Sequence, residues 1–202
     1  SNPLTGSFDV KFSPIIYPAE GQWANYTFTV LNSTTGELIM RGNYDITYGP
    51  YIKPYLINVT ILYTSPGYNL TFWYIVNIMD RRIVNAYYGT PYSPTYLLEL
   101  IETNIKLGSK VKIYGERVLT VVGSRNMKVA DLSLECWELL DQLSGFNVTC
   151  WYHKSTGLLV GYEYTLSGYY YKLMLVNVPG IALKVQTDKL FYTWGEVVNI
   201  TA

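Results

Sequence analysis

The sequence predicts an all-β, mainly antiparallel protein, built as a β-sandwich with one short helix. Two observations carry this expectation. Apolar and polar residues alternate with a period of two along most of the chain, and turns containing glycine or proline interrupt the alternation at short intervals. The aromatic share of the chain is 16%, mostly from 21 tyrosines among the 202 residues. The length suits one large β domain.

The first part of the chain has the pattern of consecutive hairpins. Gly36 lies in the first loop, where a positive φ is needed, and Pro66 and Gly67 turn the second hairpin. The expected strands here are residues 23–31, 37–47, 55–63 and 70–78, followed by a short strand that ends near Tyr88.

Residues 93–107 depart from the strand pattern. Ser93 can cap a helix, Pro94 suits the first helical position, and Gly108 can end the helix. The expected apolar face comprises Leu97, Leu98, Ile101 and Ile105. We therefore expect one short helix that covers one end of the sandwich.

Strands resume after this helix. The segment from 146 to 178 is the clearest unit, a three-stranded meander with turns at Gly157 and Gly168. The expected strands of the second part are residues 111–114, 118–123, 127–137, 146–153, 158–166, 169–178, 183–187 and 197–201.

The charge balance excludes some partners. Fifteen basic and fifteen acidic side chains cancel, so no long-range field would attract nucleic acid or an anionic membrane. No run of about 18 apolar residues could span a membrane. The chain starts at Ser1 without a signal peptide, and we expect an extracellular, cell-surface protein from which the signal peptide has been removed.

The two cysteines, Cys136 and Cys150, are separated by a segment that contains Gly145 and could turn back on itself. We expect a disulfide, which would stabilise the fold by about 3 kcal/mol in an oxidising compartment. The alternative is a pair of buried free thiols. The only histidine, His153, cannot complete a zinc site with them, so no metal and no cofactor are expected.

Six of the thirteen asparagines begin Asn-x-Thr triplets, an excess that indicates N-linked glycosylation. Glycans would explain how a surface poor in charge stays soluble. The alternative is that asparagine and threonine are merely common in β turns and strands. The six expected glycosylation sites are Asn25, Asn32, Asn58, Asn69, Asn147 and Asn199.

No catalytic motif is present: there is no nucleophile elbow, P-loop, dinucleotide fingerprint or zinc-protease motif. We therefore expect a protein that is not an enzyme. Glu135, Glu138 and Asp141 could act on a glycoside or bind calcium, but we expect them to face solvent around the disulfide loop. His153 is expected at an exposed strand end, and Arg81 is expected to be a charged turn residue.

The N-terminal segment alternates strictly. An extended chain would place Leu4, Gly6, Phe8, Val10 and Phe12 on one side. Prolines then separate this strand from the rest, which divides the sequence into a tail and linker at 1–19 and a β body at 20–202. The tail could be the first strand of its own sheet, or it could pair with another subunit by β-strand addition.

The alternating tail, the size, the sequons and the tyrosine-rich body resemble the subunits of archaeal thread filaments. Those filaments occur on thermoacidophilic archaea and are architecturally similar to bacterial type I pili. The resemblance is one of pattern over essentially the whole chain, without a short diagnostic motif. It implies an immunoglobulin/pilin-like sandwich with an N-terminal donor strand, in which Leu4, Phe8, Val10 and Phe12 fill a neighbour's groove and Gly6 marks a shallow pocket.

The same resemblance implies a structural role. Identical subunits would polymerise head to tail by donor-strand complementation into an extracellular filament that serves adhesion or biofilm formation, with other cells or surfaces as partners. The sequons and the late cysteine pair depart from the bacterial pilins, so a bacterial chaperone and usher are not implied.

Other functions fit some of the same residues. Tyr87 with Tyr88, or the run Tyr169, Tyr170 and Tyr171, could form an aromatic platform in a monomeric carbohydrate-binding module. Neighbours on a strand face opposite sides, so at least one tyrosine of each run is expected in the core. An S-layer or adhesin domain is favoured if the tail pairs within its own subunit. The C-terminal segment is a competing donor, although we expect it to be the last strand of its own sheet.

Overall fold

The computed structural model describes residues 18, 20–87, 95–141, 147–177, 186–187 and 200–201. These residues are all-β, and the only helical element among them is the short 3-10 turn η1 (Tyr114–Glu116). The strands are β1 (Trp23–Asn32), β2 (Leu38–Lys53), β3 (Leu56–Ser65), β4 (Tyr68–Asn77), β5 (Arg82–Tyr87), β6 (Thr95–Tyr96), β7 (Lys110–Ile113), β8 (Arg117–Val129), β9 (Leu132–Leu140), β10 (Val148–His153), β11 (Leu159–Leu166), β12 (Tyr169–Asn177), β13 (Gln186–Thr187) and β14 (Ile200–Thr201).

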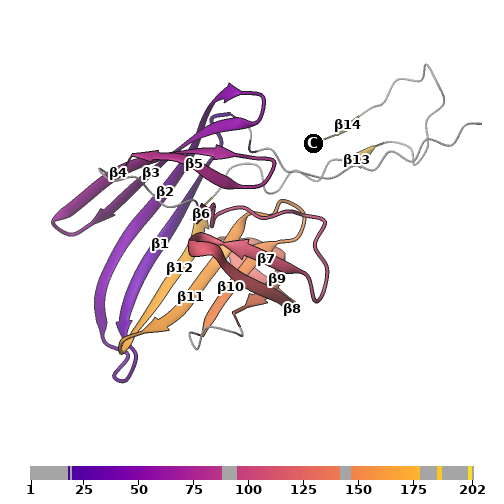
Figure 1. Ribbon diagram of the computed structural model, residues 1–202. Coiled ribbons are helices and arrows are strands. Elements are labelled where there is room, and N and C mark those ends of the chain that lie inside the picture. The colour runs from indigo at the N-terminus through magenta and orange to yellow at the C-terminus, as the bar shows by residue number, and fades with distance from the viewer. Residues whose placement is uncertain are drawn as a thin grey trace, which may run out of the picture.

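Twelve strands form one antiparallel sheet in the order β6-β5-β4-β3-β2-β1-β12-β11-β10-β9-β8-β7. The chain therefore starts in the middle of the sheet, runs out to β6, crosses to the opposite edge at β7 and returns strand by strand to β12, which pairs with β1. β6 also lies beside β7 and η1, so the sheet curls until its two ends approach each other (Figure 1). The accumulated twist of a wide sheet favours such curling. β13 and β14 pair separately.

The expected all-β, antiparallel character is confirmed, whereas the two-sheet sandwich is not found among the described residues. Each predicted hairpin is a local pairing that alternation and turn residues specify. The continuity of the sheet depends instead on one long-range pairing, in which Tyr26 lies opposite Leu175 and Phe28 opposite Leu173. Alternation along single strands does not specify that contact.

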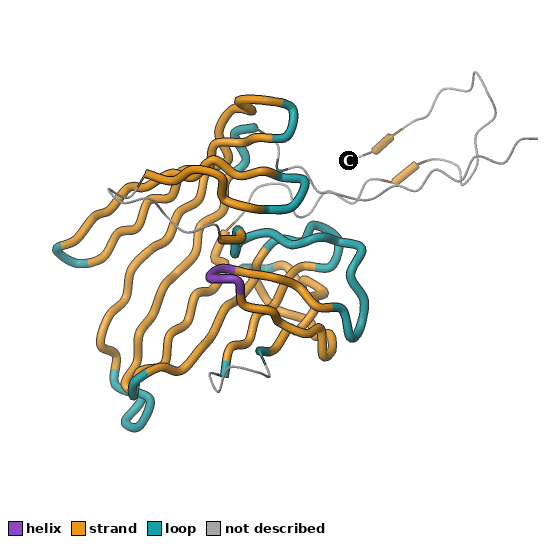
Figure 2. Tube along the Cα trace, viewed as in Figure 1, coloured by secondary structure: helices purple, strands orange, loops and turns teal. Residues whose placement is uncertain are grey.

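The predicted helix is wrong over the described part of 93–107. Thr95 and Tyr96 form β6, and residues 97–109 continue as a loop to β7 (Figure 2). The Leu97 N–H donates to the carbonyl of Arg81 at 2.8 Å, and the Ile101 N–H donates to that of Gly157 at 2.9 Å. These bonds to distant turns replace the local bonds of a helix, while both apolar side chains are still buried.

One strand boundary also differs from the prediction. Residues 124–126 were expected to separate two strands, but they lie within β8, and the turn comes at Ala130 with a φ of 49°. The polar run is exposed on the strand, opposite β9 residues that include Cys136. Polar residues on a solvent-facing strand are therefore not a turn signal by themselves.

The core occupies one face of the curled sheet, which we call the inner face; the opposite side is the outer face. In β3, Ile57, Val59 and Ile61 are buried, whereas Asn58 and Thr60 between them are partly exposed. Residues 97–101, which we call the crossing segment, pack against the inner face. Within the part of the chain described, no helix is long and apolar enough to span a membrane.

Candidate functional site

A cavity of about 430 Å³ lies between the inner face and the crossing segment. Both halves of the sheet contribute residues to it, so the cavity forms because the sheet curls and brings these halves together. Its lining residues are Tyr44 of β2, Phe72 and Tyr74 of β4, Ile83 of β5, Tyr96 of β6, Leu97, Leu98 and Glu99 of the crossing segment, Tyr114 of η1, and Tyr162 and Tyr164 of β11. We call it the tyrosine cavity.

Among the described residues that line the tyrosine cavity, only Glu99 has a carboxyl group. Its side chain is only 3% exposed, and it accepts a hydrogen bond from the Tyr44 hydroxyl. Burial raises the pKa of Glu99 above its ordinary value of 4.5, although hydrogen bonds from Tyr44 and from backbone N–H groups oppose that change. No lysine, arginine or histidine is among the described residues that line the cavity.

The crossing segment is fixed to the β10–β11 hairpin on the inner face. The Leu159 N–H donates to the carbonyl of Glu99 at 2.9 Å, and the Tyr152 hydroxyl donates to that of Leu98 at 2.8 Å. Gly157 has a φ of +67°, and a Cβ built there would lie 2.1 Å from the carbonyl oxygen of Ile101. Only glycine fits this close approach, so the hairpin turn and the position of Glu99 depend on each other.

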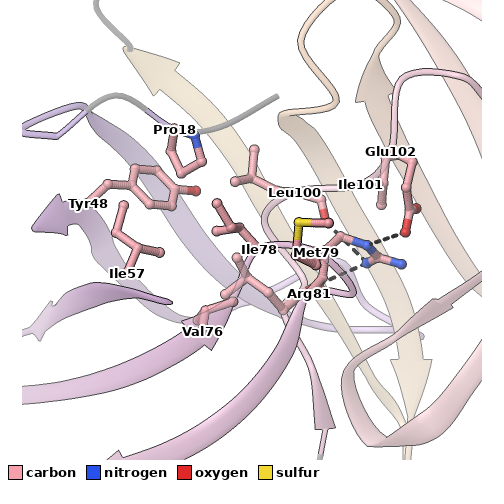
Figure 3. Close-up of a pocket in the computed structure, with 11 residues that line it drawn as sticks. Pro18, Tyr48, Ile57, Val76, Ile78, Met79, Arg81, Leu100, Ile101 and Glu102 are labelled. Atoms are coloured by element: carbon pink, nitrogen blue, oxygen red, sulfur yellow. Dashed lines mark hydrogen bonds and ion pairs between the residues drawn. The ribbon is translucent and has the colours of Figure 1, made fainter. Parts of the chain in front are cut away.

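Arg81 holds the other side of the crossing segment. It is only 8% exposed and lies between β4 and β5 with a φ of 63°. Its guanidinium donates to the carbonyls of Leu100 at 3.2 Å and Leu97 at 3.4 Å and to the carboxylate of Glu102 at 2.9 Å (Figure 3). It also donates to the carbonyl of Lys112 at 3.0 Å. One side chain thereby ties the β4–β5 turn to the crossing segment and to β7.

A second, smaller cavity of about 30 Å³ lies beside Arg81. Tyr48, which is 1% exposed, points its hydroxyl toward the side chains of Ile78 and Leu100 (Figure 3). None of the described groups forms a hydrogen bond with this hydroxyl. The volume suits a single water molecule and is too small for an organic ligand.

The aromatic rings of the tyrosine cavity contact one another. The ring centroids of Phe72 and Tyr74 are 5.4 Å apart, those of Tyr44 and Phe72 are 6.5 Å apart, and those of Tyr162 and Tyr164 are 5.2 Å apart. Spacings of this size are typical of tilted and edge-to-face aromatic pairs. The rings therefore form two walls, one on β2 and β4 and the other on β11.

The structure corrects the expected disulfide. Cys136 and Cys150 are both buried free thiols. Cys136 lies opposite His153, and Cys150 lies opposite Leu139, so the two cysteines are offset by three residues along the β9–β10 pair. Such an offset is about 10 Å and places the side chains on opposite faces of the sheet. A disulfide needs Cα atoms within about 7 Å.

Three of the six sequon asparagines lie on the outer face, because Asn25, Asn58 and Asn69 alternate with inner-face residues. Asn69 is exposed. The side-chain nitrogen of Asn25 donates to Asp45 at 2.7 Å, and the side-chain oxygen of Asn58 is buried without a hydrogen-bond partner among the described groups. The outer face thus presents these asparagines in unequal environments.

The other sequons lie in loops or outside the described residues. Asn147 is exposed immediately before β10. Asn32 begins the β1–β2 loop, where its side-chain oxygen accepts bonds from the N–H groups of Thr34 at 2.9 Å and Thr35 at 3.0 Å. Asn199 lies outside the described residues.

The carboxylates singled out in the sequence do not converge. Glu135 is exposed and pairs with Lys154 at 2.5 Å, while Glu138 accepts a hydrogen bond from the Trp151 indole at 3.2 Å. Asp141 was expected to face solvent, but its side chain is only 4% exposed. No group of three potential metal-ligating side chains gathers anywhere in the described part of the chain.

His153 was expected to be exposed, and the structure corrects this. It ends β10 as predicted but is only 9% exposed, with Nδ1 2.8 Å from the hydroxyl of Thr156. Burial lowers its pKa. The turn that follows the strand therefore does not expose this residue.

The donor-strand residues Leu4, Gly6, Phe8, Val10 and Phe12 all lie outside the described residues. Of residues 1–19, the structure describes only Pro18, whose carbonyl accepts a hydrogen bond from the Tyr51 hydroxyl at 2.9 Å.

The sequence analysis did not identify Glu99 or Arg81. A signal for Glu99 was present, because it is the one charged residue in the run Leu97-Leu98-Glu99-Leu100. On the predicted helix, Glu99 would lie on the polar face toward solvent, so its charge gave no reason to expect a buried site. Arg81 gave no signal, since a buried arginine and a charged turn residue look alike in sequence.

Comparisons with known proteins do not assign a family. No family model matches the chain, and no curated protein matches it. Among solved structures, a crystal structure of a LolA superfamily protein from Nitrosomonas europaea matches with a TM-score of 0.30 and 13% sequence identity, covering 81% of this chain and 87% of that chain. Similarity of this degree does not place the chain in that superfamily.

Proposed function

We propose that this chain is an extracellular binding module that holds a small, largely apolar molecule in the tyrosine cavity. The observation that carries the proposal is the cavity itself, with its volume of about 430 Å³. Pockets for small molecules commonly measure about 300–1,000 Å³ and have mainly apolar and aromatic walls with few polar groups. The mainly apolar and aromatic lining around one carboxyl group supports a binding role.

The contacts around the cavity support this role. Arg81 and the β10–β11 hairpin fix the crossing segment from both sides, so the walls are largely preformed. A preformed site loses less conformational entropy on binding than a site that must first order its loops.

Binding can be tested with N-phenyl-1-naphthylamine, a neutral apolar dye whose fluorescence rises when it leaves water. We expect saturable binding of one dye per chain. Leu98→Trp should fill the cavity and weaken dye binding by about tenfold or more, a change of about 1.4 kcal/mol. Val84→Trp is the matched control, because Val84 is 55% exposed and follows the cavity residue Ile83 in β5.

Thermal unfolding of both variants would establish that they are folded. The proposal fails if the native protein does not bind the dye, or if a folded Leu98→Trp variant binds it as tightly as Val84→Trp does.

We propose, as a second candidate, that the chain is a subunit of a thread-like extracellular filament. The free edge of β8 favours this function. β7 pairs only with Arg117–Thr120 of this long strand, and no described strand pairs with residues 122–129 on that side. A free edge can accept a strand from another subunit, and residues 4–12 have the alternation that such a donor needs. Arg125 and Lys128 on the edge would disfavour indiscriminate pairing.

Electron microscopy and size analysis test the filament. We expect the intact chain to polymerise, and a chain without residues 1–13 or with Phe8→Asp and Val10→Asp to remain monomeric. Asp9→Ser with Lys11→Ser is the control, because these residues lie on the other side of the predicted strand. The filament proposal fails if the intact protein stays monomeric. It also fails if the variant with both aspartate substitutions still polymerises.

N-linked glycans on the outer face are part of both proposals. They would keep a surface poor in charge soluble and would leave the inner face and its cavity uncovered. Asn69 and Asn147 are the most accessible acceptors of the described sequons. Peptide mapping of the natively produced protein tests this, and unmodified asparagine at both positions would contradict it.

A further inference from the structure

We propose that the tyrosine cavity selects ligands that carry a cationic ammonium group, which would lie between Glu99 and the aromatic wall of Tyr44, Phe72 and Tyr74. The inference rests on the proposed binding function and names the class of ligand that the site would take.

The first observation is the lack of a positive partner for Glu99. Glu99 is 3% exposed, and among the described groups only the Tyr44 hydroxyl and backbone N–H groups donate hydrogen bonds to its carboxyl. No basic residue is among the described residues that line the cavity, and no ion pair joins Glu99 to a described lysine, arginine or histidine. A buried carboxylate without a counter-charge is costly, so a ligand that supplies the positive charge gains more from it than it would in water.

The second observation is the wall beside that carboxyl. Tyr44 donates its hydroxyl hydrogen bond to Glu99 and packs against Phe72 with a centroid distance of 6.5 Å, and Phe72 packs against Tyr74 at 5.4 Å. Aromatic faces attract cations within about 6 Å of the ring centroid, and ammonium groups in aromatic surroundings are a common use of this attraction. Carboxyl and rings are therefore contiguous on one side of the cavity.

Three described basic residues gather at one side of the cavity, around its lining residue Tyr96. Arg81, Arg82 and Lys112 lie around the ring of Tyr96 at 5.4 to 5.7 Å. Arg81 is also paired with Glu102 at 2.9 Å.

At the opposite wall, burial raises the pKa of Tyr162 and Tyr164, and the positive charge of Arg117 opposes that rise. The Arg117 guanidinium is 3.9 Å from the carboxylate of Asp141. These charges lie toward Tyr96 and β11, which leaves the wall on β2 and β4 as the place for an ammonium group.

A charged probe and its uncharged isostere test this selectivity. Phenyltrimethylammonium and tert-butylbenzene have the same shape and differ in charge, and each would be used to displace N-phenyl-1-naphthylamine from the native protein. We expect the cation to bind about tenfold more tightly, or better. In Glu99→Gln, with its own dye affinity measured first, the ratio of the two affinities should fall to about one. Asp45→Asn removes an outer-face carboxylate and should keep the preference of the native protein.

The outcomes separate the two proposals. If the dye does not bind the native protein, the proposed binding function itself fails. If the dye binds but the two probes displace it equally well, the binding function stands and the cation preference is overturned. A preference that persists in folded Glu99→Gln overturns the role of Glu99. If that variant does not fold, the ratio measured on the native protein still decides whether the cavity prefers a cation.

Discussion

Glu99 is a buried carboxyl group among side chains that are otherwise apolar or phenolic. Tyr26 and Tyr48 are buried and Tyr44 is partly buried in this part of the core, and desolvation raises the pKa of each phenol above its ordinary value of 10.0. These phenols therefore stay neutral at physiological pH. Glu99 is the group whose protonation can change in this part of the core.

The raised pKa of Glu99 makes a prediction about stability and pH. The folded state holds the proton of Glu99 more strongly than the unfolded state does, so the protein should lose stability as pH rises from about 4.5 through the higher folded pKa. Glu99→Gln keeps a group that can bond to Tyr44 and does not titrate. The free energy of unfolding of this variant, relative to the native protein, should therefore increase with pH over that range.

Denaturant unfolding of both proteins at pH 4 to 8 measures this difference. A relative stability that stays constant across the range would contradict the assignment, because it would mean that Glu99 titrates alike in the folded and unfolded states.

The two cysteines give a second prediction at this scale. Both thiols are buried, and burial raises the pKa of Cys136 to about 12. A thiol reacts as its thiolate, so we expect neither cysteine to react with a thiol reagent in the native protein and both to react in denaturant without a reductant. Absence of free thiols in the denatured protein would show that they are oxidised, contrary to the strand register.

At the scale of elements, the crossing segment holds the two halves of the sheet together on the inner face. Its backbone bonds reach the β4–β5 turn at one end and the β10–β11 hairpin at the other. Its apolar side chains are buried in the core. The contacts of this segment therefore set the shape of the cavity.

Gly157→Ala tests this arrangement. The added Cβ would collide with the carbonyl oxygen of Ile101 at a position with positive φ, and we expect a loss of about 2 kcal/mol or more in the free energy of unfolding. Dye affinity should fall as well, because the crossing segment moves. Gly168→Ala is the control, since Gly168 also has a positive φ but a Cβ there meets nothing within 4 Å. Equal losses in both variants would mean that only backbone strain matters.

At the scale of the whole molecule, the pairing of β1 with β12 decides the fold. It joins two six-stranded meanders into one sheet and places Asn25 of β1 opposite Asn177 of β12. Without it, two separate sheets would remain, and the cavity would lack one of its walls.

A designed cross-link tests this pairing. Thr29 lies opposite Lys172 across β1 and β12, so Thr29→Cys with Lys172→Cys should form a disulfide on oxidation. Glu163 lies opposite Lys172 on the next strand, and Thr29→Cys with Glu163→Cys should not cross-link, because the two positions are about 10 Å apart. Mass spectrometry of the oxidised variants distinguishes these results. Failure of the first pair, or equal cross-linking of both, would contradict the sheet order.

The sequence by itself determined most of the strands, because alternation and turn glycines act over a few residues. The 146–178 meander was predicted closely, as β10, β11 and β12 show. The tertiary structure decided everything that depends on distant partners. Residues 97–101 have a helical spacing of apolar side chains, but bonds to Arg81 and Gly157 hold them in a different conformation. Curling of the sheet placed Glu99 among tyrosines from β2, β4 and β11, and no local pattern encodes an encounter between residues so far apart in the chain.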